Sequence, residues 1–286
     1  MTLQTKRWLL VAAFPFLLSL TAVFPVRAAD AVANVRLYAI DCGRIRVSDM
    51  SAFADTGELD GKPASVVASC FLIRHPKGTL LWDTGLSDKL AENKGGVENG
   101  IFKLSVTKGL VDQLKTIDIS PSEITFLAFS HLHFDHTGNA NAFDSSTWIL
   151  NKDEIAWAEA TPTPLGVAPD SFAASRTAKT QMIDGDHDVF GDGSVRILKT
   201  PGHTPGHGVL EVKLRKSGVV ILSGDLYHSR ANRKFKRVPR LNVERADTLA
   251  SIDRVEKIVK NTRARFIVQH DVDDFASLPR FPAFLE

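Results

Sequence analysis

Cysteine is scarce in this sequence, which contains only Cys42 and Cys70 among 286 residues. Neither cysteine lies in a C-x-x-C pair or beside a histidine, so the sequence argues against a metal site built from thiolates. In an oxidising compartment the two residues could form one disulfide. Two free, buried cysteines are an equal alternative, because both residues lie in strand-like segments.

Long apolar runs are absent after the first part of the chain. Lys6 and Arg7 precede an apolar stretch at 8–26, and small residues suitable for cleavage follow it. This arrangement is typical of a secretory signal peptide. A membrane anchor is the alternative, but the stretch contains two prolines, which weaken a continuous helix. We therefore expect residues 1–28 to be a cleaved signal peptide, and the protein to be exported, periplasmic or secreted, with no membrane contact after cleavage.

A basic excess is also lacking. Removal of residues 1–28 takes away three of the 35 basic residues and none of the 33 acidic ones, which leaves a net charge of −1. Nucleic-acid-binding proteins usually carry a strong basic excess, so we expect no nucleic-acid partner. No repeat or Pro/Ser-rich linker divides the remainder, and we expect residues 29–286 to form a single domain.

Strands dominate the predicted secondary structure. Short apolar segments, often β-branched and bounded by turn residues, predict strands at 34–40, 65–73, 78–85, 124–131, 146–151, 194–200, 208–214, 218–225 and 264–271. A 3.6-residue apolar period predicts a helix at 243–262, and weaker signals predict helices at 105–117 and 151–160. Residues 87–103 and 160–180 are expected to be loops. Blocks of strands broken by single helices favour two packed sheets with helices outside them.

Potential metal ligands crowd together where one predicted strand ends. His131 and His133 are two residues apart, so in an extended chain they point to the same side and can hold one ion. Asp135 and His136 follow at a predicted turn, which can direct them toward a second ion. An H-x-H-x-D-H pattern therefore predicts a centre with two metal ions rather than a polar loop with incidental histidines.

Three further strands end in similar residues. His203 and His207 follow the strand at 194–200, and the strand at 218–225 leads into Asp225, Tyr227 and His228. His270 and Asp271 end the last predicted strand. Nitrogen and oxygen donors without thiolates suit zinc, with iron, manganese or cobalt as alternatives.

The motifs "HLHFDH", "TPGHTPGH", "SGDLYH" and "QHD" occur in the order and approximate spacing of the metallo-β-lactamase-fold hydrolases. Within that superfamily the chain most resembles the N-acyl homoserine lactonase family, including "LLWDTG" near the start and the final "FPAFLE". The resemblance implies an α/β fold, an αββα sandwich of two mixed β-sheets flanked by helices. It also implies two Zn²⁺ ions and a small lactone or ester substrate.

The resemblance assigns roles to individual residues. Asp225 would bridge the two ions, Asp83 would support the site from outside, and His207 would lie behind the ligands. The implied ligands are His131, His133 and His203 for one ion, and Asp135, His136 and His270 for the other.

The implied activity is the hydrolysis of an ester or the opening of a lactone ring, as in quorum quenching. A hydroxide between the two ions would attack the carbonyl carbon, because metal ions lower the pKa of bound water to about 7. Asp135 would then pass a proton to the leaving oxygen. The family has a tyrosine three residues after the bridging aspartate, whereas this chain has His228 there and Tyr227 one residue earlier. We expect His228 or Tyr227 to stabilise the oxyanion.

Other activities are compatible with the same ligands. The alternative is an exported metallo-hydrolase of another ester, a thioester or a phosphotriester. A β-lactamase of the main zinc class would present cysteine where Asp225 stands. A non-catalytic metal-binding protein is a third class, but ligands at strand ends beside lid-like loops favour an open catalytic site. The sequence does not indicate the oligomeric state.

Two other features have plain interpretations. The basic stretch 230–240 is expected to be a solvated rim, or alternatively a surface that attracts anionic substrate groups. His75 has no neighbouring ligands in the sequence and is expected to lie on the surface.

Overall fold

The computed structural model describes residues 1–2 and 34–286. The predicted signal peptide therefore lies almost wholly outside the described residues. Residues 34–286 belong to one compact unit. Among the helices of the described residues, none has the length and apolar character needed to cross a membrane.

The larger sheet has eight strands in the order β4-β5-β1-β2-β3-β6-β7-β8. Neighbouring strands are antiparallel from β4 to β3 and parallel from β3 to β8, so the sheet is mixed. Its strands are β1 (Arg36–Val47), β2 (Ala64–His75), β3 (Gly78–Trp82), β4 (Val97–Asn99), β5 (Phe102–Ser105), β6 (Phe126–Ala128), β7 (Thr147–Asn151) and β8 (Thr180–Ile183).

The smaller sheet has five strands in the order β13-β12-β11-β10-β9. Only the β12–β13 pair is parallel among these neighbours in the described chain. Its strands are β9 (His187–Asp188), β10 (Val195–Lys199), β11 (Gly208–Leu214), β12 (Gly218–Leu222) and β13 (Arg265–Ile267).

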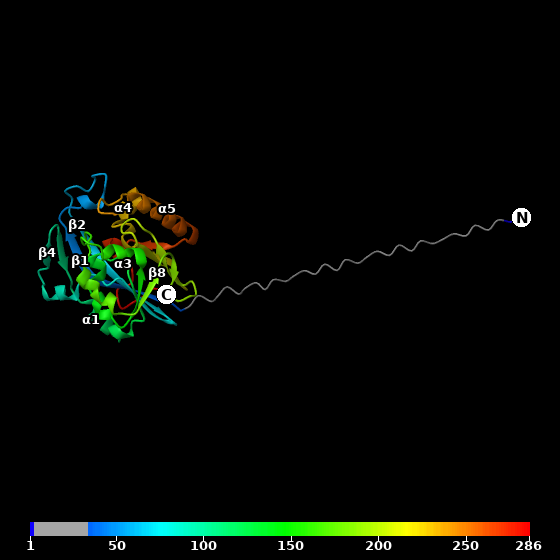
Figure 1. Ribbon diagram of the computed structural model, residues 1–286, viewed down its shortest axis with the longest axis horizontal. Coiled ribbons are helices and arrows are strands. Elements are labelled where there is room, and N and C mark those ends of the chain that lie inside the picture. Colours follow the sequence, from blue (N-terminus) through cyan, green and yellow to red (C-terminus); the bar gives the residue numbers. More distant parts are fainter. Residues whose placement is uncertain (3–33) are drawn as a thin grey trace. The chain divides into compact units, whose positions relative to one another are not determined.

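Helices cover both outer faces. Figure 1 shows α4 and α5 on one side of the strands and α1 on the other. Ile252 and Val255 of α5 pack on the smaller sheet, and Leu110 and Leu114 of α1 pack on the larger one. The helices are α1 (Leu110–Lys115), α2 (Phe134–Thr137), α3 (Lys152–Ala158), α4 (Arg230–Phe235), α5 (Arg245–Thr262) and α6 (Val272–Ala276).

The main core lies between the sheets. Phe71 and Trp82 of the larger sheet pack with Leu210, Val212 and Leu222 of the smaller one. Two sheets joined by an apolar core and covered by helices form an αββα sandwich, which confirms the predicted fold class.

Each predicted strand occurs, but short strands were missed. β4 and the first two residues of β5 lie in the expected loop 87–103, and β8 and β9 were not predicted. β4 is exposed throughout and β9 has two residues, so neither shows an apolar period. The helix predicted at 243–262 is α5, which begins after the capping carboxylate of Glu244.

The structure settles the state of Cys42 and Cys70, which the sequence left open, and corrects the position expected for His75. Cys42 and Cys70 form a disulfide between β1 and β2, which decides between the two alternatives. The surface position expected for His75 is wrong: its side chain is buried, stacks on Phe190 and lies 2.9 Å from Asp192 Oδ2. Asp192 lies on a loop remote in sequence, so the sequence held no sign of this contact.

The basic stretch 230–240 begins with the unpredicted helix α4. Arg230 and Arg233 pair with Asp274 and Glu256. Arg237 and Arg240 lie near Glu58 and Asp60. These pairs neutralise most of the arginine charge, so the stretch fits a rim better than an anion-attracting surface.

Gln269 joins the two sheets near one end of the sandwich. Its Oε1 accepts hydrogen bonds from the Trp82 indole at 3.0 Å and from the Gly224 amide at 2.8 Å. Its Nε2 donates to Asp83 Oδ2 at 2.9 Å. The side chain is almost fully buried, so these bonds replace those that water would make.

We predict that Gln269→Ala lowers the free energy of unfolding by roughly 3 kcal/mol or more. The substitution leaves buried partners unsatisfied, and each such group costs about 1–3 kcal/mol. Urea denaturation measures the change. Gln181→Ala, at an exposed position on β8, is the matched control and should change stability by no more than about 0.5 kcal/mol. Equal effects of the two variants would show that the network contributes little.

Candidate metal centre

The predicted ligands gather at one edge of the sandwich because they follow the ends of strands. β6 leads to His131, and His133 immediately precedes α2, which carries Asp135 and His136. From the smaller sheet, β10 leads to His203, β12 to Asp225 and β13 to His270. In the part of the chain that the structure describes, these side chains form two groups that could each hold a metal ion.

The first group is His131, His133, His203 and Asp225. His131 Nε2 lies 2.9 Å from His133 Nδ1 and 3.2 Å from His203 Nε2. His203 Nε2 lies 3.1 Å from His133 Nδ1 and 3.2 Å from Asp225 Oδ2. Ligand atoms placed tetrahedrally around zinc at 2.0–2.1 Å lie about 3.3 Å apart, so this spacing fits such an ion.

The second group is Asp135, His136 and His270. His136 Nε2 and His270 Nε2 lie 3.2 Å apart, and Asp135 Oδ2 lies 3.6 Å from the latter. Asp225 Oδ1 lies 3.2 Å from His136 Nε2 and 2.9 Å from His270 Nε2. Asp225 therefore turns one carboxylate oxygen to each group.

The pKa values of the ligand side chains suit the binding of cations. Burial, with the neighbouring histidines, holds the pKa of His131 and of His133 well below the ordinary value, so their lone pairs are free. Burial opposes ionisation of Asp225, but the surrounding histidines hold the pKa of its carboxyl well below its ordinary value. Asp225 Oδ1 is buried and has no hydrogen-bond partner among the described residues. Burial opposes protonation of His136 and His270, but Asp83 and Asp225 raise the pKa of the first, and Asp225 and Asp135 raise that of the second. A buried carboxylate among buried imidazoles is a donor set that fits a metal ion, whose charge would take the place of those protons.

Outer partners orient the ligand rings. Asp83 Oδ2 lies 3.1 Å from His136 Nδ1, in the supporting position predicted for it. Asn242 Oδ1 lies 2.9 Å from His203 Nδ1, and the Val67 carbonyl oxygen lies 2.8 Å from His270 Nδ1. Such contacts at the far ring nitrogen set the tautomer that faces a metal.

His207 lies behind the centre rather than in either group. Its Nε2 accepts a hydrogen bond from the Asp225 amide at 2.9 Å, and its Nδ1 lies 3.0 Å from the Thr200 carbonyl oxygen. Burial and the nearby His203 lower the pKa of His207 to about 3. The ring is therefore neutral and holds the backbone of Asp225 in place.

Glu154 on α3 is a supporting residue that the sequence analysis missed. Its Oε1 accepts from the Leu132 amide at 2.9 Å and its Oε2 from the Gly206 amide at 3.0 Å. Leu132 lies between two ligands of the first group, and Gly206 follows the third. The buried carboxylate thus joins ligand segments from both sheets. A glutamate in a polar helix segment gives no signal of burial in the sequence.

His228 lies at the centre, as expected. Its Nε2 is 3.0 Å from Asp225 Oδ2, and its ring stacks on His270 with centroids 5.7 Å apart. The edge of the ring also meets Phe53. His228 Nδ1 is buried with no hydrogen-bond partner in the described chain.

The structure does not bring Tyr227 to the centre, which corrects the expectation that its hydroxyl could reach the substrate. That hydroxyl donates to Glu256 Oε1 of α5 at 3.1 Å, and the ring packs on Phe266. Burial and Glu256 raise the pKa of Tyr227 above its ordinary value. The backbone at Tyr227 is extended, so consecutive side chains face opposite sides and only His228 points to the ligands.

A cavity of about 320 Å³ opens beside both groups. Its polar wall includes His133, Asp135, His203, Asp225, His228 and His270. The rest of the wall is largely apolar and includes Ile45, Val47, Phe53, Val66, Phe102, Phe134, Leu165 and Leu241. The arrangement can hold a small molecule with a polar end at the ligands and an apolar end away from them.

Known proteins are similar to this chain in sequence over most of its length. An N-acyl homoserine lactonase named AttM from Azorhizobium caulinodans is 26% identical over 271 residues, which cover 88% of this chain and 99% of the relative. The N-acyl homoserine lactonase AiiA from Bacillus thuringiensis subsp. kurstaki is 28% identical over 257 residues, with coverage of 87% and 98%. These relatives bear out the resemblance drawn from the motifs.

Solved structures of lactonases are also similar to this chain in fold. A structure of an N-acyl homoserine lactone hydrolase, with N-hexanoyl-L-homoserine bound at its catalytic metal centre, matches with a TM-score of 0.76 and 27% identity. The match covers 87% of this chain and 98% of that one. The dizinc quorum-quenching lactonase AidC shares the fold, with a TM-score of 0.66, 18% identity, and coverage of 88% and 90%.

The family comparison spans the ligand segments of both groups. Residues 65–270 match the metallo-beta-lactamase superfamily, and this range contains His131, Asp225 and His270. The chain belongs to the metallo-beta-lactamase superfamily.

Proposed function

We propose that this protein is a metal-dependent hydrolase that opens N-acyl homoserine lactones, and so acts in quorum quenching. The observation that carries the proposal is the position of Asp225, whose two carboxylate oxygens each face one group of potential ligands. The relatives support this choice of substrate, because they are named N-acyl homoserine lactonases and this chain matches them over nearly their whole length.

In this proposal the first group and the second group would each hold one ion, and Asp225 would offer one carboxylate oxygen to each ion. Two Zn²⁺ ions suit the five histidines and two carboxylates, and iron, manganese or cobalt are alternatives. When bound, two such ions lower the pKa of a water molecule toward neutrality and supply positive charge for a carbonyl oxygen.

The residues of the chain supply the remaining chemistry. The Asp135 side chain lines the cavity, where its carboxylate can carry a proton to the leaving alkoxide of the opened ring. His228 lines the cavity, and its Nε2 lies beside the ligands, 3.0 Å from Asp225 Oδ2. With that carboxylate held by metal ions, an N–H at Nε2 would be free to donate to a carbonyl oxygen lying over the ligands. His228 thus takes the part that a tyrosine plays in the family.

The apolar wall of the cavity supports an acylated substrate. Phe53, Phe102 and Phe134 line it together with aliphatic side chains. Each methylene group that leaves water for such a wall contributes about 0.8 kcal/mol. A lactone ring at the ligands and an acyl chain against this wall match the two halves of the cavity.

We also propose export. The pattern of residues 1–28 supports it, as does the Cys42–Cys70 disulfide, because such bonds persist in oxidising compartments.

Product analysis tests the activity. We expect the zinc-loaded protein to add one water to short- and long-chain N-acyl homoserine lactones, as measured by mass spectrometry against the uncatalysed reaction. Asp225→Ala should reduce conversion to the uncatalysed rate, because both groups lose their shared ligand. Asp144→Ala, at an exposed position, is the control and should retain activity. No conversion by protein with two bound ions would refute the lactone substrate and direct the search to aryl esters and phosphotriesters.

His228→Ala tests the proposed oxyanion donor. Loss of one such donor costs about 10²–10³-fold in rate, so we expect kcat to fall by that factor while two ions stay bound. His187→Ala, on β9 of the smaller sheet, is the matched control. If the His228 variant loses metal in step with kcat, the residue supports the ions rather than the substrate.

Intact mass measurement of protein recovered outside the cytoplasm tests export. We expect a chain that begins near residue 29. Recovery of the protein only from the cytoplasm, with residues 1–28 retained, would contradict the proposal.

A further inference from the structure

The Cys42–Cys70 disulfide lies directly against the turn that follows β3. Gly85 in this turn has a φ of +63°, and a Cβ atom added to it would lie 2.1 Å from the Cβ of Cys42 and 3.1 Å from the Sγ of Cys70. The Leu86 amide donates to the Cys42 carbonyl at 3.1 Å. The backbone of the turn therefore packs on the disulfide without room for a side chain.

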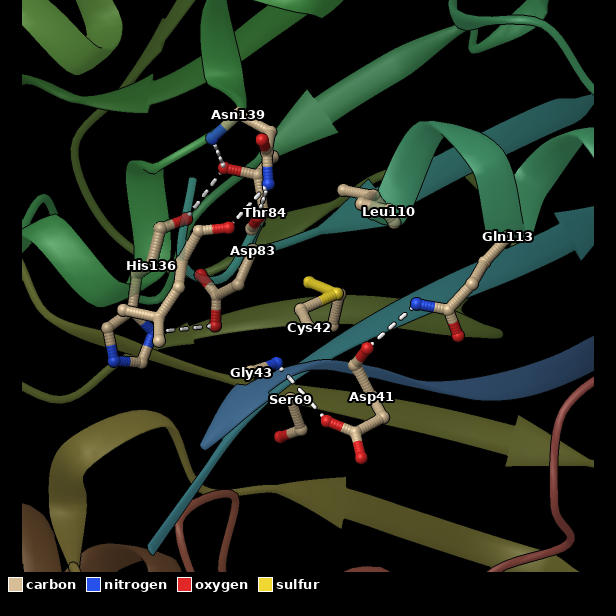
Figure 2. The surroundings of a disulfide bond; sticks show 12 residues. Asp41, Cys42, Gly43, Ser69, Asp83, Thr84, Leu110, Gln113, His136 and Asn139 are labelled. Atoms are coloured by element: carbon tan, nitrogen blue, oxygen red, sulfur yellow. Dashed lines mark hydrogen bonds and ion pairs between the residues drawn. A yellow bond between two sulfur atoms is a disulfide. The ribbon is translucent and has the colours of Figure 1, made fainter. Parts of the chain in front are cut away.

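The other side of the same turn holds His136. The Thr84 amide and hydroxyl both donate to the His136 carbonyl oxygen, at 2.7 and 3.0 Å. Asp83, in the left-handed region with a φ of +58°, contacts the His136 ring at Nδ1. Figure 2 shows Asp83 and Thr84 between the disulfide and His136.

β2, which carries Cys70, holds the other histidine of the second group. The Val67 amide donates to the His270 carbonyl at 3.1 Å, and the Val67 carbonyl oxygen lies 2.8 Å from His270 Nδ1. The Ser69 hydroxyl donates to the Gln269 carbonyl at 2.8 Å. His270 is thus anchored on β2, which carries Cys70, and His136 is anchored on the turn that packs against the disulfide.

The first group has one link to the same turn and several other contacts. The Ser130 hydroxyl, which donates to Asp83 Oδ2 at 3.0 Å, lies 3.1 Å from His131 Nδ1. Glu154 holds the segments around Leu132 and Gly206, and Asn242 contacts the ring of His203. These supports come from α3 and from the segment before α5, not from the strands that the disulfide joins.

We propose that the Cys42–Cys70 disulfide is a positioning element for the second group, which sets the geometry of His136 and His270 and so the affinity of one of the two ions. The inference rests on the proposed two-metal centre and not on the identity of the substrate. In a reducing compartment the chain would hold that ion more weakly, so full metal loading would follow disulfide formation.

Zinc titration of the full chain against a chromophoric chelator tests this inference. In Cys42→Ala/Cys70→Ala we expect one of the two ions to bind about 10–100-fold more weakly, the range found when an outer partner of a ligand is lost. The affinity for the other ion should change much less, because only the Ser130 contact links its histidines to the turn beside the disulfide. His270→Ala should lower the affinity for the ion of the second group, which identifies the affected ion. Adding His270→Ala to the double cysteine variant should not further lower the affinity for the ion of the first group.

Three further variants separate positioning from general destabilisation. Thr84→Val keeps the disulfide but removes one hydrogen bond to His136, and should weaken the same ion. Leu214→Ala is a core substitution at the end of β11, and should lower Tm without changing either affinity. Glu154→Gln keeps the shape of a side chain that supports the first group, and should lower the affinity for the ion of that group.

The outcomes are distinguishable. If the wild-type protein binds fewer than two ions, the proposed two-metal centre is wrong. If it binds two and the cysteine variant binds both with unchanged affinity, the positioning role is wrong. Equal weakening of both ions, or the same weakening in Leu214→Ala, would also overturn it. Should the cysteine variant fail to fold, the Thr84→Val titration decides.

Discussion

The metal centre depends on the buried polar contacts that Gln269 makes between the two sheets. Its side chain binds Trp82 on one sheet, Gly224 on the other, and Asp83 in the turn beside His136. A buried network of this kind is stable only when each member has a partner, so it allows few other arrangements. Ligands from the two sheets therefore meet in one geometry before any ion binds.

Two supports extend this arrangement in different directions. Glu154 joins the loops that carry the first group, and the Cys42–Cys70 disulfide packs on the turn that holds the second group. Asp225 faces both groups, and neutral His207 holds its backbone in place. Because these supports are largely different, the proposed two-metal centre predicts that one ion can be weakened more than the other, whereas loss of Asp225 would affect both.

The adjacent residues Tyr227 and His228 show how backbone geometry sets the chemistry. Extended backbone sends their side chains to opposite faces, so the tyrosine enters the core under α5 and the histidine faces the ligands. The family tyrosine is thus replaced by an imidazole and not by its neighbour. Beside it, Phe53 begins the apolar wall of the cavity.

The sequence by itself determined most strands around the core and the ligand-type residues at the strand ends, since apolar period and strand-end ligands are local patterns. The αββα class and the assignment of the ligands to two ions came from the resemblance of its motifs to the metallo-β-lactamase-fold hydrolases. The sequence missed β4, β5, β8 and β9, which are short or exposed, and it misplaced His75. Tertiary structure decided that Cys42 bonds to Cys70, that Tyr227 faces Glu256 and that Glu154 is buried. These outcomes depend on contacts between segments remote in sequence, which no local pattern encodes.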